Sequence, residues 1–258
     1  MNDSIHFRGK LVYFSNLNSL RAIAALLVVL FHCEEWLPSF SNLYLLSIMD
    51  ILSFNGRGGE IGVHFFFILS GFLITFLLLN EIKHAGAVHI GKFYLRRFFR
   101  IWPLYFFTLL IGFAIIPLFI PNEQSESSLF MYVLFLSNID NISSPTNNGI
   151  LGVHWSVAIE EQFYLFWPLL FFLNKRLLLF FMFILFAFSE IFFLLVYSLS
   201  VKYLHTFSNI RLLATGGMLG YISFYRGAIV EKILSHISRK GFIILHVFFV
   251  CLLFFSIK

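Results

Sequence analysis

The feature that most constrains this chain is a series of long apolar segments. They cover residues 18–33, 61–80, 101–120, 129–139, 154–173, 177–199, 210–225 and 241–257. Most approach the roughly 20 residues that cross a bilayer as a helix. Of the 258 residues, 59% are hydrophobic and only 12% are charged, and the mean hydropathy is +0.88. A soluble domain cannot bury so many apolar side chains, so the sequence predicts an all-α, polytopic membrane bundle of seven or eight transmembrane segments.

The shortest of these segments, residues 129–139, decides the expected topology. If it does not cross the membrane, most of the 18 Lys and Arg residues fall on one side; if it crosses, they divide more evenly. Basic residues concentrate on the cytoplasmic side of membrane proteins. The sequence therefore predicts seven spans, a cytoplasmic N-terminus and a re-entrant or interfacial piece at 129–139. The first apolar segment lacks a small-residue cleavage site, so we expect it to remain as a span. Cys33 and Cys251 both stand in apolar context, which predicts neither a disulfide nor a metal site.

Arg21 and His32 stand near opposite ends of the first apolar segment, LRAIAALLVVLFHC. Because a helix turns by ~100° per residue, this spacing brings the two residues to within ~20° of one face, with a rise of ~16 Å. A charge inside a membrane span is costly and usually functional. Both residues are therefore candidate catalytic groups. An Arg that snorkels to the interface, with a His just past the span, explains the pattern equally well.

A second basic cluster, FYLRRFFRIWPLYFF, opens the third apolar segment. Arg96 and Arg100 share one helix face, Arg97 lies beside them, and Pro103 can kink or restart the helix. Guanidinium groups bond phosphates bidentately, so the cluster is a candidate site for phosphates or pyrophosphates. Ordinary anchoring on the cytoplasmic side is the alternative explanation.

A third stretch, GVHWSVAIEEQFYLFWP, carries polar groups into a membrane segment. Ser156 and Glu160 are one helical turn apart, and Glu161 follows directly. Carboxylates at this depth must be neutral, paired or turned toward water. Arg21, or His32 when protonated, is an available partner. Glu161 can also be explained as a residue of the membrane interface, whereas Glu160 is harder to explain in that way.

These motifs together resemble the acyltransferase-3 family of integral membrane acyltransferases. The resemblance rests on LNSLRAIAALLVVLFH, GVHFFFILSGFLI, RRFFRIWPLYFF, HWSVAIEEQFYLFWP and RLLATGGMLGYIS, which follow one another in the family's order over roughly residues 17–225. Two positions depart from it: Asn18-Ser19 stands where the family commonly has Asp-Gly, and His64 where it commonly has an acid. Family members usually have roughly ten spans of about 20 residues. We therefore expect residues 1–258 to form a single acyltransferase-3 domain that is shortened at its C-terminus.

The resemblance implies an O-acetyltransferase. Such an enzyme transfers an acyl group, most often acetyl, from cytoplasmic acyl-CoA to a hydroxyl of a cell-surface or lipid-linked glycan such as an O-antigen or exopolysaccharide. It implies that Arg96, Arg97 and Arg100 hold the phosphates of CoA and that His32 acts as a general base or carries the acyl group. Glu160 would orient or balance His32 or Arg21, and Ser156 would offer a hydroxyl nearby. The expected partners are acyl-CoA, the glycan acceptor and the lipid bilayer of a bacterial inner membrane, with no metal and no nucleic acid.

Two other functions fit the same residues. Buried Arg, Glu and His side chains also suit a transporter or flippase of a lipid-linked sugar, although the two halves contain no visible inverted repeat. The short chain also suits an inactive, truncated paralogue. The glycines of RLLATGGMLGYIS (Gly216, Gly217 and Gly220) are more readily explained by close helix packing than by phosphate binding.

Overall fold

The computed structural model describes residues 6–8, 11–13, 15–36, 58–119, 127–144 and 149–236. The last expected segment, residues 241–257, lies outside these ranges. The chain divides into two compact units, a central unit of residues 67–220 and an N-terminal unit of residues 1–66 with 221–258. The arginine cluster and the Glu160–Glu161 pair belong to the central unit, whereas Arg21 and His32 belong to the N-terminal unit.

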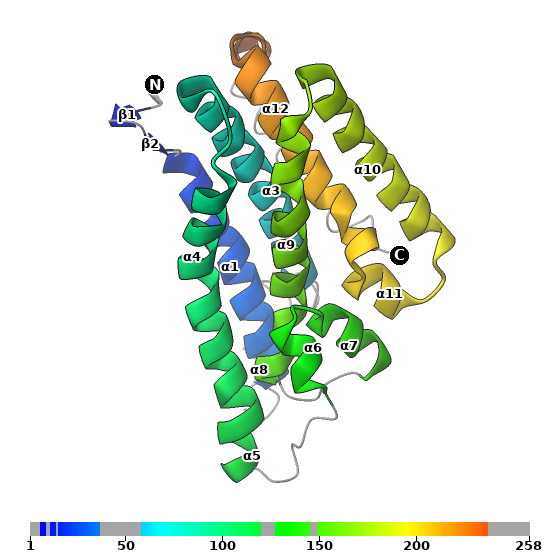
Figure 1. Cartoon of the computed structure of the whole chain (residues 1–258). Helices are drawn as coiled ribbons and strands as arrows, with labels where there is room; N and C mark the ends of the chain where they lie inside the picture. The colour runs from blue at the N-terminus through cyan, green and yellow to red at the C-terminus, as the bar shows by residue number, and fades with distance from the viewer. Residues whose placement is uncertain are drawn as a thin grey trace. The chain divides into compact units, whose positions relative to one another are not determined.

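Apart from one short hairpin, the described residues are mainly helical, as the composition predicts (Figure 1). In chain order the elements are β1 (His6–Arg8), β2 (Leu11–Tyr13), α1 (Ser15–Trp36), α3 (Gly58–Ala85), α4 (Ile90–Leu110), the π-helix η2 (Ile111–Ile115), α5 (Ile116–Phe119), α6 (Leu129–Val133), α7 (Ser137–Ser143), α8 (Gly149–Gly152), α9 (His154–Phe166), the 3₁₀-helix η4 (Trp167–Phe172), α10 (Lys175–Leu195), α11 (Leu199–Leu204) and α12 (Thr206–His236). The two strands pair antiparallel, with Phe7 opposite Val12. Helix α4 continues through Pro103 without a break.

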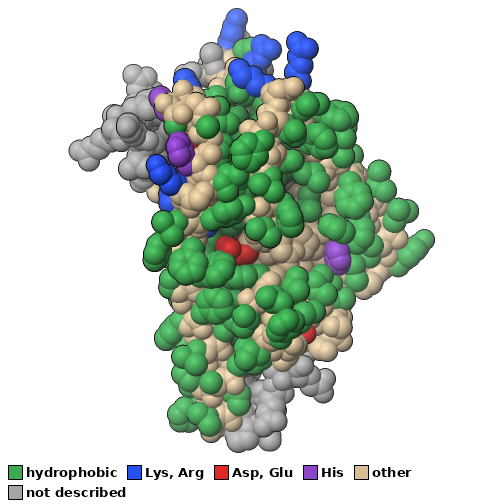
Figure 2. Space-filling model, in the orientation of Figure 1, with side chains coloured by type: hydrophobic (Ala, Val, Ile, Leu, Met, Phe, Trp, Pro, Cys, Tyr) green, Lys and Arg blue, Asp and Glu red, His purple; other side chains and the backbone are tan. Residues whose placement is uncertain are grey.

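Three of the described helical segments are long and apolar enough to cross a bilayer: Gly58–Ala85, Ile90–Phe119 and Lys175–Leu195. A shorter apolar helix covers Leu17–His32. Large hydrophobic side chains are exposed along α4 and α10, and Figure 2 shows hydrophobic side chains over most of the visible face. Exposed apolar surface of this extent suits contact with lipid rather than with water. The protein is therefore a multi-pass membrane protein, as the composition predicts.

Residues 129–139 do not form one continuous helix. Helix α6 ends at Val133, and α7 begins at Ser137. Between them Phe135 has a φ of 56°, in the left-handed region, so α6 cannot continue into α7. A helix as short as α6 rises by only ~7.5 Å, far less than the ~30 Å of a hydrocarbon core. Residues 129–139 therefore do not form a single helix long enough to span a bilayer, and the topology expected from the basic residues stays a prediction.

The helices on the two sides of residues 129–139 run in opposite directions through the central unit (Figure 1). In Figure 1 the starts of α4 and α10 lie at one end of this unit, and α6, α7, α8 and α11 lie at the other. The chain thus passes through the unit once in α4 to α5 and returns once in α9 to η4. Lys92 at the start of α4 and Lys175 at the start of α10 consequently lie at the same end.

Within the N-terminal unit, α1 packs closely on the first turns of α3. A Cβ at Gly59 would collide with the Phe31 ring, and one at Gly62 would collide with the carbonyl of Ala24. Ala24 is also buried, with 1% of its surface exposed. The stripe of α1 that contains Ala24 and Phe31 therefore faces α3.

Within the central unit, α3 and α12 meet along a seam of glycines. A Cβ at Gly71 or at Gly216 would collide with a backbone carbonyl of the facing helix. Gly217 lies against the Trp167 ring, and Gly220 lies against the backbone of α3. Small residues allow two membrane helices to approach backbone to backbone, which increases their van der Waals contact. The predicted packing role of the glycines in RLLATGGMLGYIS is confirmed.

Candidate functional site

Arg21 and His32 both lie on α1 and are both half-buried. At ~100° per residue they fall beside the stripe that contains Ala24 and Phe31 and faces α3. Nδ1 of His32 lies 2.8 Å from the carbonyl oxygen of Val28. A carbonyl only accepts hydrogen bonds, so Nδ1 carries a proton, and in the neutral form of the ring the lone pair is on Nε2. The contact thus favours, for the neutral ring, the tautomer that can take up a proton at Nε2.

Glu160 of α9 is held by two hydroxyl groups of the central unit. The Ser70 hydroxyl on α3 donates to one carboxylate oxygen and the Tyr164 hydroxyl to the other, both at 2.8 Å. The Ser156 hydroxyl, one turn earlier on α9, donates to the carbonyl oxygen of Val153 at 3.2 Å. The pairing of Glu160 with His32 or Arg21 stays a prediction, because α1 and α9 belong to different units.

Glu161 faces α4 rather than α3. The indole N–H of Trp102 on α4 donates to Oε2 of Glu161 at 3.0 Å. The second oxygen, Oε1, is shielded from solvent, and no donor among the described residues bonds it. A buried polar atom without a partner is uncommon and costs roughly 1–3 kcal/mol, more for a charged group. Glu161 therefore differs from Glu160 in having one buried carboxylate oxygen that no donor among the described residues bonds.

The three arginines of α4 have different surroundings. Arg96 is exposed and forms an ion pair with Glu81 at 3.2 Å. Arg100 is also exposed. Arg97 is half-buried, and its guanidinium lies 5.3 Å from the centre of the Tyr164 ring and 5.6 Å from that of the Phe93 ring. The structure thus distinguishes Arg97, which contacts α9, from its two neighbours.

Arg97 and Glu161 line one cavity between α4 and α9 with a volume of about 500 Å³. Trp102, Phe135 and Tyr164 contribute aromatic walls. In Figure 2 an acidic side chain is visible in the middle of the hydrophobic face, where Figure 1 places α4 beside α9. A cavity of this size accommodates a ligand the size of a small organic molecule. Its cation and its carboxylate can orient a ligand that has both acidic and N–H groups.

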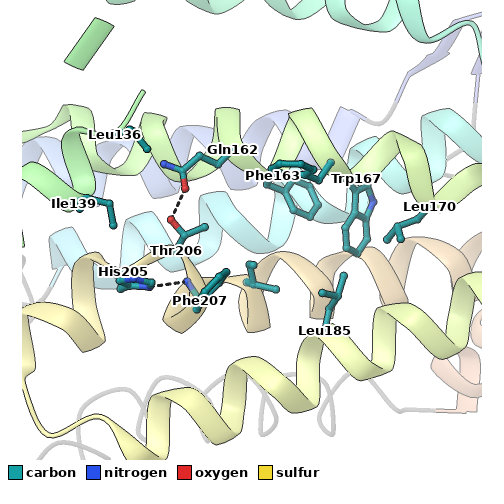
Figure 3. A pocket seen from close by; sticks show the side chains of 12 residues that line it. Leu136, Ile139, Gln162, Phe163, Trp167, Leu170, Leu185, His205, Thr206 and Phe207 are labelled. Carbon is teal, nitrogen blue, oxygen red and sulfur yellow. Dashed lines mark hydrogen bonds between the residues drawn. The ribbon is translucent and has the colours of Figure 1, made fainter. Parts of the chain in front are cut away.

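A second cavity of the central unit, about 630 Å³, is almost entirely apolar (Figure 3). Its polar edge includes Gln162, which accepts a hydrogen bond from the Thr206 hydroxyl, and His205, whose Nδ1 accepts the backbone N–H of Phe207. Burial lowers the pKa of His205, which favours the neutral ring that can accept this hydrogen bond. Charged side chains are absent from the described lining of this cavity, in contrast to the cavity between α4 and α9.

The sequence did not identify the partners that hold these groups. Ser70, Trp102 and Tyr164 all stand inside the quoted motifs, but their roles depend on which helices become neighbours. His154, which also enters α9, instead packs against the rings of Tyr105 and Tyr132. The position of Tyr164 one helical turn after Glu160 is the one local signal that could have revealed a contact.

Comparison with known proteins agrees with these motifs. The family described as "Acyltransferase domain" matches residues 14–258. The peptidoglycan O-acetyltransferase OatA of Listeria monocytogenes is 32% identical over 168 residues, which are 57% of this chain and 27% of the relative. The O-acetyltransferase OatA of Staphylococcus aureus is 30% identical over 166 residues, 61% of this chain and 24% of the relative.

The chain spans about a quarter of the length of these curated relatives. No solved structure matches it. The family match, in contrast, extends over nearly all of the chain and includes every motif on which the sequence resemblance rests. The protein therefore belongs to the acyltransferase-3 family.

Proposed function

We propose that the protein transfers an acetyl group from acetyl-CoA to a hydroxyl of a cell-surface or lipid-linked glycan. The observation that carries this proposal is the contact of His32, a histidine in an apolar helix whose Nδ1–H is bonded to the carbonyl of Val28, so that Nε2 is the ring nitrogen that can take up a proton when the ring is neutral. A general base of this kind is what transfer of an acyl group to a hydroxyl requires. Family membership and the printed names of the relatives support the same chemistry.

In the proposed reaction, Nε2 of His32 takes the proton of the acceptor hydroxyl. The hydroxyl oxygen attacks the thioester carbonyl, the carbon–sulfur bond breaks, and the proton passes from the imidazolium to the departing thiolate of CoA. The products are the glycan acetyl ester and free CoA. The alternative that His32 itself carries the acyl group for part of the cycle requires the same lone pair on Nε2.

The remaining predicted site residues serve this reaction in our proposal. Arg97, with Arg96 and Arg100 beside it, binds the phosphates of the donor. Glu160 orients or balances the charge of His32 or Arg21, and Ser156 offers a hydroxyl near them. This assignment places the start of α4 and the N-terminus on the cytoplasmic side of a bacterial inner membrane, where acyl-CoA is available. The predominance of basic residues at that end of the central unit supports this orientation.

The test is acetyl transfer from radiolabelled acetyl-CoA to glycan in membranes that contain the protein. His32→Ala should lower the rate by roughly 100-fold or more, which is the usual contribution of a general base. His84→Ala is the matched control, because His84 is exposed at the end of α3. Membrane levels of both variants should equal that of the unchanged protein. Full activity of His32→Ala would refute the proposed chemistry, and uptake of unmodified solute without labelled glycan would indicate a transporter.

A further inference from the structure

The cavity between α4 and α9 is amphipathic, and most of its polar groups are already engaged. The Tyr94 hydroxyl donates to the carbonyl of Leu165 at 2.7 Å, and the Tyr164 hydroxyl donates to Glu160. Groups that are already bonded in this way add shape to the cavity but little new hydrogen-bonding capacity.

The side-chain amide of Gln162 is also hydrogen-bonded within the central unit. Its amide nitrogen donates to the carbonyl of Phe135 at 2.7 Å and to the side-chain oxygen of Asn138 at 2.9 Å. Its amide oxygen accepts the hydroxyl of Thr206. The donors and the acceptor of this amide are therefore all in use within the central unit.

Glu161 differs from these residues because only one of its oxygens has a donor. Trp102 bonds Oε2, and no donor among the described residues bonds Oε1. The terminal torsion of a glutamate side chain is broad, so a small rotation turns the carboxylate toward the cavity that it lines. A ligand N–H in the cavity would then remove the cost of an unpartnered carboxylate oxygen.

Arg97 supplies the complementary charge in the same cavity. The rings of Phe93 and Tyr164 position its guanidinium. Along α4, Arg97 and Trp102 are separated by a rise of ~7.5 Å, and Trp102 in turn holds Glu161. A ligand that fits both groups therefore carries an anion at one end and an amide N–H a short carbon chain away, with apolar groups that contact the aromatic walls. The phosphopantetheine arm of an acyl-CoA has this arrangement.

We propose that the cavity between α4 and α9 binds the pantetheine arm of the acyl donor and that Glu161 accepts a hydrogen bond from one of its amide N–H groups. The identity of the donor rests on the proposed function. The assignment adds to that function a residue, Glu161, that binds the donor through hydrogen bonding rather than through phosphate charge. It also distinguishes Glu161 from its neighbour Glu160, both of whose oxygens are bonded to hydroxyl groups of the central unit.

The first test uses the unchanged protein in detergent and two unreactive thioether analogues of acetyl-CoA. One analogue keeps both amides of the pantetheine arm, and the other has an ester in place of each amide. We expect the amide analogue to bind about tenfold more tightly, as one hydrogen bond to a carboxylate contributes. Equal binding of the two analogues to the unchanged protein would overturn the inference, whatever any variant does.

The second test repeats the measurement with Glu161→Gln. A glutamine that accepts from Trp102 presents N–H rather than oxygen to the cavity, so the preference for the amide analogue should disappear. Glu190→Gln is the matched control, because Glu190 pairs with Arg211 away from this cavity, and it should keep the preference. In transfer assays Glu161→Gln should raise KM for acetyl-CoA about tenfold with kcat little changed. A loss of kcat at unchanged KM would contradict the assignment.

Binding and transfer separate this inference from the proposed function. Preferential binding of the amide analogue by the unchanged protein, without transfer of label to any glycan, would support the donor site and contradict the acetyltransferase assignment. Transfer of label together with equal binding of the two analogues would support the acetyltransferase assignment and contradict the proposed role of Glu161.

Discussion

The central unit contains two helix contacts of opposite character. Helices α3 and α12 meet through glycines, backbone against backbone, so that a single added Cβ would collide with the facing helix. Helices α4 and α9 are separated by large aromatic side chains and enclose a cavity of about 500 Å³ that contains a cation and a carboxylate. The first contact is stabilised by close van der Waals packing, and the second leaves room for a ligand.

This difference follows from the residues that each helix presents to its neighbour. Glycine lets two membrane helices approach closely without the loss of side-chain entropy that larger residues incur. The Trp102 ring packs in a tilted arrangement against Phe98 at a centroid distance of 4.8 Å and against Phe135 at 5.2 Å, and these large rings keep the two helices apart. Substitutions in the seam should therefore alter stability, and substitutions around the cavity should alter ligand binding.

The largest effect is expected in the seam. Gly216→Ala places a Cβ against the backbone of α3, which cannot move aside as a flexible side chain could. We expect a loss of about 3 kcal/mol of stability, the upper end for overpacking, measured by thermal or denaturant unfolding in detergent. Gly149→Ala is the control, because nothing lies within 4 Å of a Cβ at that position. Equal stability of the two variants would mean that the α3–α12 contact is looser than described.

A smaller effect, confined to binding, is expected at the cavity. Arg97→Gln should weaken the affinity for acetyl-CoA by about 2 kcal/mol, or roughly 30-fold in KM, because a charge-assisted contact with phosphate is lost. The value of kcat should change little, since such a contact is made equally in the ground and transition states. Arg100→Gln, at an exposed position of the same helix, should raise KM less. Equal effects of the two substitutions would indicate a diffuse basic surface instead of a defined cavity.

The smallest effect is expected where the two regions adjoin. Ser70 precedes Gly71 of the seam on α3 and donates to Glu160. Ser70→Ala removes one donor from a carboxylate that keeps its bond to Tyr164, so stability should fall by about 1 kcal/mol, the low end for such a group. The measurement is the melting temperature of Ser70→Ala. Ser143→Ala is the control, because Ser143 is an exposed residue of α7. An unchanged melting temperature would show that Ser70 does not stabilise Glu160.

The sequence predicted those features that depend on local pattern. Apolar segments predicted the helices, and the glycines of RLLATGGMLGYIS predicted close packing. The topology inferred from the distribution of Lys and Arg stays a prediction. It did not predict that Trp102 bonds Glu161 or that Arg97, alone of its cluster, lies against Tyr164. These contacts join residues distant along the chain, and periodicity gives only the face of a helix, not its neighbour. The predicted meeting of Glu160 with His32 is likewise a contact between helices that local pattern cannot decide.

The amide of Gln162 has a consequence for how this part of the molecule unfolds. It bonds the left-handed turn at Phe135, the first turn of α7 through Asn138, and the first residue of α12 through Thr206. None of these three stretches can move far from α9 without breaking a hydrogen bond of this half-buried amide. The turn, the start of α7 and the α11–α12 corner therefore open as one cooperative unit with α9 rather than fraying separately.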